Sequence, residues 1–173
     1  MPRSLPHRIP VALPPSTPGV PAGHDGGMSS VFSLIIDGTI PGTFVWADDV
    51  CVAFATIEPI TPGHMLVVPR VEVDQFTHLE DDILAHLVVV AKHIGLAQQR
   101  AFDAPRAALI VAGFEVPHTH LHVLPAWSEA ALTFANARSV PAEQLAADAE
   151  RVRGALRELG HGDRVPPSIS SPG

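Results

Sequence analysis

Residues 116–125, with the sequence VPHTHLHVLP, carry a histidine at every second position. Side chains alternate between the two faces of an extended chain, so His118, His120 and His122 are expected to lie on one face. The residues between them fall on the other face, which is mostly apolar and suited to a core. Imidazoles need hydrogen-bond partners and titrate near neutral pH. The pattern therefore predicts a strand with a polar, reactive row on one side.

Three interpretations of this histidine row are open. The side chains could simply be exposed on a solvated strand. They could bind zinc, which accepts imidazole ligands and activates water, although no carboxylate or cysteine is fixed nearby in the sequence. They could also act on phosphorus, with one neutral imidazole as the nucleophile and its neighbours binding the phosphate and the leaving group.

Several blocks of the sequence resemble the histidine-triad (HIT) family. Residues 118–123 are similar to the family signature, with Thr119 at a position that is more often apolar. Four upstream blocks follow the family's order and spacing: residues 31–41, 48–49, 54–59 and 62–70. The resemblance covers about residues 29–135, and several blocks in register are more specific than one short motif.

The hydrophobic pattern indicates an α+β fold. Strands are expected at residues 43–46, 50–57, 64–69, 106–112 and 117–124, a long helix at 80–102, and a further helix at 141–159. Short connections favour antiparallel neighbours, with the long helix on one face and the histidines near an open edge. The resemblance implies the HIT-like fold, a five-stranded antiparallel sheet with one long helix and a C-terminal helix. It also implies a homodimer joined through the long helix and the last two strands.

Composition divides the chain into three parts. Residues 1–28 are rich in proline and glycine, so we expect a disordered tail with no signal peptide. Residues 29–160 are expected to form the HIT domain, including the C-terminal helix, and residues 161–173 a flexible tail.

Charge and cysteine content limit the partners and the compartment. The formal charge is −7 and Lys92 is the only lysine, which argues against a nucleic acid or a membrane as a standing partner. Cys51 is the single cysteine, so no intramolecular disulfide can form and a reducing, cytoplasmic compartment is expected. It lies in an apolar run and is interpreted as a small buried hydrophobe.

The resemblance implies a hydrolase that cleaves a nucleoside phosphoramidate or a related nucleotidyl ester. The substrate would be a small derivative of a purine nucleoside monophosphate, and the scheme needs no cofactor. His120 would attack the α-phosphorus and form a nucleotidyl-histidine, which water then hydrolyses. His122 would bind a phosphate oxygen or the leaving atom, and His118 would support the row. A backbone carbonyl is expected to hold the tautomer of His120.

The resemblance also assigns a nucleoside pocket. Five apolar residues stand at positions that sandwich the base in relatives, although each could equally be ordinary core: Val31, Phe32, Ile35, Phe54 and Ile57. Backbone N–H groups near Glu115 and Val116 could bind developing negative charge. Trp127 and residues 128–136 could also reach the pocket.

Three positions depart from the family pattern. Thr56 stands where relatives have an aspartate that binds the ribose, so ribose recognition should be weakened. The loop before the triad is short, and Glu115 places a carboxylate where it would repel a phosphate unless turned away or paired. In many members, cysteines at the positions of Ser30 and Ser33 hold a structural zinc, with a histidine near Glu72. Serine is a poor zinc ligand, so no metal site is expected.

These departures keep two alternatives open. The chain could be a nucleotide-binding sensor or scaffold module with little turnover. It could also be a metal-dependent hydrolase that uses the histidine row as ligands. A covalent adduct on His120 would argue against the first alternative, and activity in the presence of a chelator against the second.

Overall fold

The computed structural model describes residues 29–172, and the expected disordered tail lies outside them. The five strands are β1 (Phe44–Ala47), β2 (Cys51–Ala55), β3 (Met65–Pro69), β4 (Arg106–Val111) and β5 (Leu121–Ala126). The α-helices are α1 (Val31–Ile36), α2 (Asp81–Phe102) and α3 (Ala142–Glu158). Short 3-10 turns are η1 (Phe76–His78), η2 (Glu129–Ala131), η3 (Phe134–Asn136) and η4 (Gly162–Arg164).

The strands form one antiparallel sheet in the order β1-β2-β3-β5-β4. The predicted five-stranded antiparallel sheet is therefore confirmed. The expectation of an open edge beside the histidines is wrong, because β5 pairs with β3 on one side and β4 on the other. The register aligns Phe54, Leu66 and His122 across three strands, so their side chains share one face of the sheet.

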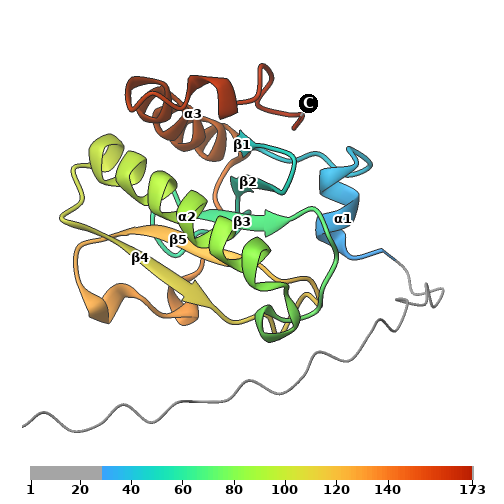
Figure 1. The fold of residues 1–173 in the computed structure, drawn as a ribbon. Helices are drawn as coiled ribbons and strands as arrows, with labels where there is room; N and C mark the ends of the chain where they lie inside the picture. Colours follow the sequence, from blue (N-terminus) through green and yellow to red (C-terminus); the bar gives the residue numbers. More distant parts are fainter. Residues whose placement is uncertain (1–28, 173) are drawn as a thin grey trace, which may run out of the picture.

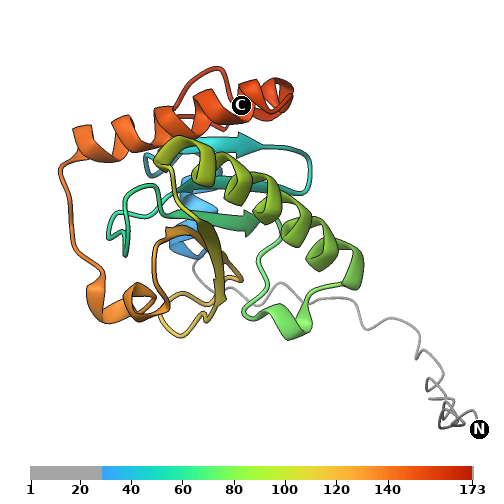
Figure 2. The ribbon, with the colours of Figure 1, turned by 90° about the vertical axis from the view of Figure 1, so that its left-hand side faces the viewer.

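The two faces of the sheet carry different cores (Figures 1 and 2). Helices α2 and α3 cover one face and enclose the larger apolar cluster, which includes Val67 and Val123. The short helix α1 lies on the other face, where Phe32 packs with Phe54 and Leu66. A helix of six residues cannot cover a whole sheet face. This face therefore has room for a cavity beside His122.

Helix α2 is fixed to the sheet at several points. Two acidic residues in its first turn, Asp81 and Asp82, complement the helix dipole. A Cβ at Gly95 would lie 3.0 Å from the Cβ of Ala107, so glycine allows the close approach of α2 to β4. The buried amide of Gln98 donates to two backbone carbonyl oxygens at the sheet.

Within residues 29–172, no helix combines the length and apolar character needed to cross a bilayer.

Residues 161–172, which the sequence analysis assigned to a flexible tail, pack against the domain. Val165 and Ile169 contact the core under α3. The N–H of Phe44 donates to the carbonyl of Ile169 at 2.6 Å. The buried guanidinium of Arg153 donates to the carbonyl oxygens of Phe44 and Pro166 at 2.9 and 2.7 Å. The folded domain therefore extends past α3 and covers part of the β1 edge.

Candidate active site

The three histidines of the row lie on the α1 face of the sheet. His122 belongs to β5, whereas His118 and His120 lie in the irregular segment just before it, so the strand begins later than predicted. The ring of Phe32 lies 6.0 Å from the ring of His118 and 4.9 Å from that of His120, measured between centroids. The rings of His120 and His122 are 4.8 Å apart. The period of two thus places the three imidazoles side by side.

His118 is fully buried and holds the neighbouring His120 in place. Nε2 donates to the carbonyl oxygen of Pro69 at 2.9 Å, which leaves Nδ1 to accept the hydroxyl of Ser30 at 2.7 Å. The carbonyl oxygen of His118 in turn lies 2.8 Å from Nδ1 of His120. A carbonyl can only accept, so His120 carries its proton on Nδ1 and keeps a lone pair on Nε2.

A fourth histidine, His64, fixes the tautomer of His122. Nδ1 of His64 accepts the backbone N–H of Ile60 at 3.2 Å, so the proton of the neutral ring is on Nε2. Nε2 of His64 lies 3.1 Å from Nδ1 of His122 and donates to it. The proton of His122 is therefore on Nε2. Two neighbouring imidazoles consequently have opposite roles, with a lone pair on His120 Nε2 and an N–H on His122 Nε2.

The cluster is held in its neutral form at pH 7. Burial lowers the pKa of His64 to about 3 and the pKa of His122 to about 4, and neighbouring histidines add to the effect. Burial also lowers the pKa of His118 and of His120, while the carboxylate of Glu115 acts in the opposite direction on His120. A neutral imidazole is the form that can act as a nucleophile.

The lowered histidine pKa values predict that the protein loses stability in mild acid. Below pH 6.5, the histidines of the unfolded chain are protonated, whereas His64 and His122 of the native chain stay neutral because their pKa values are lowered. The free energy of unfolding is therefore expected to fall as the pH drops from 6.5 toward 4, and the slope from His64 and His122 together reaches roughly 2.7 kcal/mol per pH unit at about pH 5. Urea unfolding at a series of pH values measures this slope.

Two variants isolate the histidine contribution to that slope. His64→Gln should reduce the slope by about 1.4 kcal/mol per pH unit, because a group that cannot titrate no longer contributes. Val71→Gln should leave it unchanged, since Val71 is an exposed residue without a titratable group. Equal slopes in the wild type and in His64→Gln would contradict the assignment of a neutral buried His64.

A cavity of about 480 Å³ lies in front of the row. Ten of the predicted site residues line it: Val31, Phe32, Ile35, Phe54, Thr56, Ile57, Glu115, Val116, His120 and His122. His118 is the exception, because its side chain is fully buried and does not line the cavity. The volume is within the range of small-molecule sites and suits a nucleoside monophosphate. The structure therefore brings together residues that are more than 90 positions apart in the sequence.

The residues that line the pocket differ in burial and in hydrogen bonding. Phe32 and Phe54 are also core, with ring centroids 5.7 Å apart and buried side chains. Ile57 is 74% exposed at the rim. Thr56 accepts the N–H of Glu58 at 3.4 Å and keeps its hydroxyl proton free for a ligand oxygen. Glu115 is exposed at the cavity, so its carboxylate is close to any phosphate bound at His120.

The sequence did not indicate one of the contacts beside the histidine row. His64 follows a turn and shows no partner in the sequence, yet it contacts His122. Phe134 of η3 lines the cavity, and its ring lies 5.0 Å from that of His122. The expectation that residues 128–136 reach the pocket is met by Phe134, whereas Trp127 is half exposed and does not line the cavity.

The residues at the family's zinc position do not fit a metal. The hydroxyl of Ser30 is bonded to Nδ1 of His118, and Glu72 accepts the N–H of Ser30 and the hydroxyl of Ser33. Hydroxyl groups are poor zinc ligands. Hydrogen bonds thus hold together the side chains at this position, and they lower the pKa of Glu72.

Within residues 29–172, a second group of potential ligands is Asp48, Cys51 and His86. The carboxylate of Asp48 already accepts the N–H groups of Trp46, Cys51 and His86, among others. Burial and the neighbouring Asp48 raise the pKa of the Cys51 thiol, which keeps it protonated. A protonated thiol is not a metal ligand, so this group is a hydrogen-bonded structural cluster.

Comparison with known proteins identifies the family. The HIT domain profile matches residues 37–129, which is more than half of the chain. An uncharacterised HIT-like protein of Saccharolobus solfataricus is 35% identical over 104 residues, which cover 57% of this chain and 75% of the relative. The chain therefore belongs to the HIT family.

Solved structures support the same assignment. A hypothetical histidine triad nucleotide-binding protein from Sulfolobus tokodaii has a TM-score of 0.66 at 26% identity, covering 74% of this chain and 92% of the other. A HIT family hydrolase from Legionella pneumophila has a TM-score of 0.52 at 30% identity, covering 62% of this chain and 99% of the other. The predicted HIT-like α+β fold is confirmed.

Proposed function

We propose that this protein is a nucleotide hydrolase that cleaves a nucleoside phosphoramidate or a related nucleotidyl ester through a nucleotidyl-histidine intermediate. One observation carries the proposal. Nε2 of His120 has its lone pair free at a cavity of nucleoside size, because Nδ1 is bonded to the carbonyl of His118. The similarity to a HIT family hydrolase and to a histidine triad nucleotide-binding protein supports it.

In the first step, Nε2 of His120 forms a bond to the α-phosphorus as the phosphorus–nitrogen bond breaks. The electron pair of that bond goes to the leaving nitrogen, which takes a proton from His122. His122 donates it as an imidazolium, a form that the bound phosphate anion favours. Nδ1 of His122 is then protonated as well, so in this step His64 is proposed to carry its own proton on Nδ1 and to accept from His122 through Nε2. The first products are an amine and a nucleotidyl group on His120, with His122 neutral.

In the second step, water attacks the phosphorus. The bond between phosphorus and Nε2 of His120 breaks, and the neutral His122 accepts a proton from the attacking water. This returns His122 to the imidazolium form and releases a nucleoside monophosphate. Val116 and Glu115 line the cavity, and their backbone N–H groups are proposed to bind the phosphate oxygens as charge develops.

A time course with adenosine 5′-phosphoramidate tests this proposal. The expected result is release of AMP and ammonia at the same rate with and without a chelator, because the proposed steps use side chains alone. Loss of activity with the chelator and recovery with added zinc would favour the metal-dependent alternative. Binding of AMP without turnover would favour the sensor or scaffold alternative, which the Glu115 carboxylate at the cavity makes reasonable.

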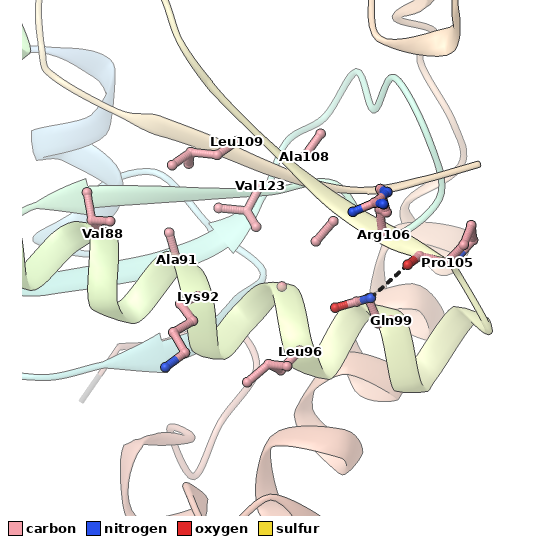
Figure 3. Close-up of a pocket in the computed structure, with 12 residues that line it drawn as sticks. Val88, Ala91, Lys92, Leu96, Gln99, Pro105, Arg106, Ala108, Leu109 and Val123 are labelled. Atoms are coloured by element: carbon pink, nitrogen blue, oxygen red, sulfur yellow. Dashed lines mark hydrogen bonds between the residues drawn. The ribbon is translucent and has the colours of Figure 1, made fainter. Parts of the chain in front are cut away.

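We also propose that two copies of the chain form a homodimer through the groove between α2 and β4. This groove has a volume of about 340 Å³ and is lined by apolar residues that include Val88, Leu96 and Leu109 (Figure 3). Strand β4 ends the sheet, and Leu109 is 47% exposed. An edge strand beside an apolar helix face is well suited to a second copy, which would continue the sheet.

We also propose that the protein is located in the cytoplasm, because a single cysteine is typical of proteins in a reducing compartment.

Leu109→Arg is expected to convert the dimer to a monomer, because it replaces an exposed apolar side chain of the groove by a charged one. Sedimentation equilibrium measures the mass directly. Val71→Arg is the matched control, since Val71 is a similarly exposed apolar residue that does not line the groove. A wild-type chain that sediments as a monomer, or a dimer that tolerates Leu109→Arg, would contradict this interface.

A further inference from the structure

The two reactive imidazoles lie between two phenyl rings. The ring of Phe32 from α1 meets His120 edge-on with centroids 4.9 Å apart, and the ring of Phe134 from η3 meets His122 edge-on at 5.0 Å. The imidazoles themselves are 4.8 Å apart. The contacts thus run in the order Phe32, His120, His122, Phe134. Each imidazole has its own apolar wall.

The order of these four rings predicts that the two halves of a substrate bind at different ends of the cavity. Displacement at phosphorus places the attacking and leaving atoms roughly in line on opposite sides. If the nucleoside lies against Phe32 and its neighbours and His120 attacks, the leaving atom is directed toward His122. Whatever is attached to the leaving atom then lies against Phe134. The walls beyond His122 therefore determine which leaving groups fit.

The wall at Phe134 is held in place by the same chain. The backbone N–H of Arg138 donates to the carbonyl of Pro59 at 3.3 Å, and the hydroxyl of Ser139 donates to Oε1 of Glu58 at 3.2 Å. These bonds join the segment that carries Phe134 to the loop between β2 and β3. Leu145 from the first turns of α3 adds a second apolar side chain to the cavity wall.

The charged side chains that line the cavity are acidic. Glu58 and Glu115 line it, and no lysine or arginine does so in the part of the chain that the structure describes. Arg138 is near in sequence, but its guanidinium donates to the carbonyl oxygens of Ala135 and Ala137 and does not line the cavity. The bond to Ser139 places Glu58 on the Phe134 side. A leaving group that extends past Phe134 therefore meets a negative charge.

We propose that Phe134, Leu145 and Glu58 form a leaving-group subsite that selects an aliphatic amine with a second positive charge at its far end. The inference rests on the proposed hydrolase function and names its substrate class. The apolar walls accommodate the methylene chain, and Glu58 attracts the terminal ammonium. The same charge disfavours leaving groups that carry a carboxylate or further phosphates.

A matched series of adenosine 5′-phosphoramidates tests the subsite in the full chain. The leaving amines are ammonia, butylamine, 1,4-diaminobutane and 4-aminobutanoate, of which the last three share a four-carbon chain. Butylamine is expected to raise kcat/KM about tenfold over ammonia through its methylene groups. The diamine should exceed butylamine by about threefold, and the carboxylate should fall below it by about the same factor. High salt should reduce the charge effects and leave the methylene effect.

Two substitutions assign the effects to residues. Phe134→Ala should remove most of the advantage of butylamine over ammonia, and Phe134→Leu should retain part of it in a variant that keeps an apolar side chain. Phe76→Ala is the control, because Phe76 is exposed and does not line the cavity. Glu58→Gln should bring the diamine and carboxylate substrates to similar kcat/KM values, whereas Glu80→Gln, at the start of α2, should not.

The outcomes separate this inference from the function on which it rests. Hydrolysis of none of the four compounds would overturn the proposed hydrolase and the subsite with it. Hydrolysis of all four at equal kcat/KM, or a preference for the carboxylate, would overturn the subsite alone. A charge preference that survives Glu58→Gln would also overturn it, because the selecting charge would then lie elsewhere.

Discussion

Replacement of His120 by alanine is expected to lower kcat for adenosine 5′-phosphoramidate by at least about 10⁴-fold, as expected for loss of a nucleophile. The cavity keeps its other walls, because His120 is one of many residues that line it. Affinity for AMP should therefore change by less than about tenfold. Single-turnover kinetics measure the first effect, and calorimetric titration of AMP measures the second.

His86→Ala is a suitable control for this variant. His86 lies on α2 and is bonded to Asp48, away from the cavity. It should retain activity within about threefold, because the hydrogen-bond partner of its side chain, Asp48, also lies outside the cavity. If His120→Ala kept more than a tenth of the wild-type rate, His120 would not be the nucleophile, and a water activated elsewhere in the cavity would have to be considered.

The second large effect is expected at His122, and its size should depend on the leaving group. With a butylamine phosphoramidate, His122→Asn should lower kcat by about 10²- to 10³-fold, because an amine must be protonated as it leaves. With the p-nitrophenyl ester of AMP the loss should be less than about tenfold, since nitrophenolate leaves without a proton. Comparison of kcat for the two substrates in the wild type and the variant measures the difference.

The leaving-group comparison distinguishes a proton donor from a residue that only binds phosphate. Equal losses for both substrates would show that His122 acts through binding alone. His64→Gln provides an intermediate case, because it removes the imidazole that contacts Nδ1 of His122 and exchanges a proton with it. It should reduce the rate with the amine substrate more than the rate with the nitrophenyl ester.

Local patterns predicted much of the fold. The period of two around His120 placed the row on one face, and the spacing of apolar residues located α2 to within one residue of its start. These signals are properties of neighbouring residues, so a single sequence contains them. The pocket residues came from resemblance to the HIT family, and the structure gathers them around one cavity, which neither His118 nor Trp127 lines.

Long-range contacts could not be predicted in this way. The insertion of β5 between β3 and β4 depends on pairing between distant segments, which alternation alone does not specify. The bond between His64 and His122 joins residues 58 positions apart. Phe134 lies in a 3-10 turn without hydrophobic periodicity, so the sequence indicated its segment, residues 128–136, but not this residue. Similarly, Val165 and Ile169 are isolated apolar residues in a proline-rich stretch.

The central claim is that His120 forms a covalent bond to the nucleotide, and rapid acid-free quenching followed by peptide mass spectrometry tests it most directly. During turnover of adenosine 5′-phosphoramidate, the account predicts an adenylyl group on the peptide that carries His120, and its absence in His120→Ala. Turnover at the full wild-type rate with no adduct at quench times shorter than one catalytic cycle would contradict it, as would an adduct on His122 instead.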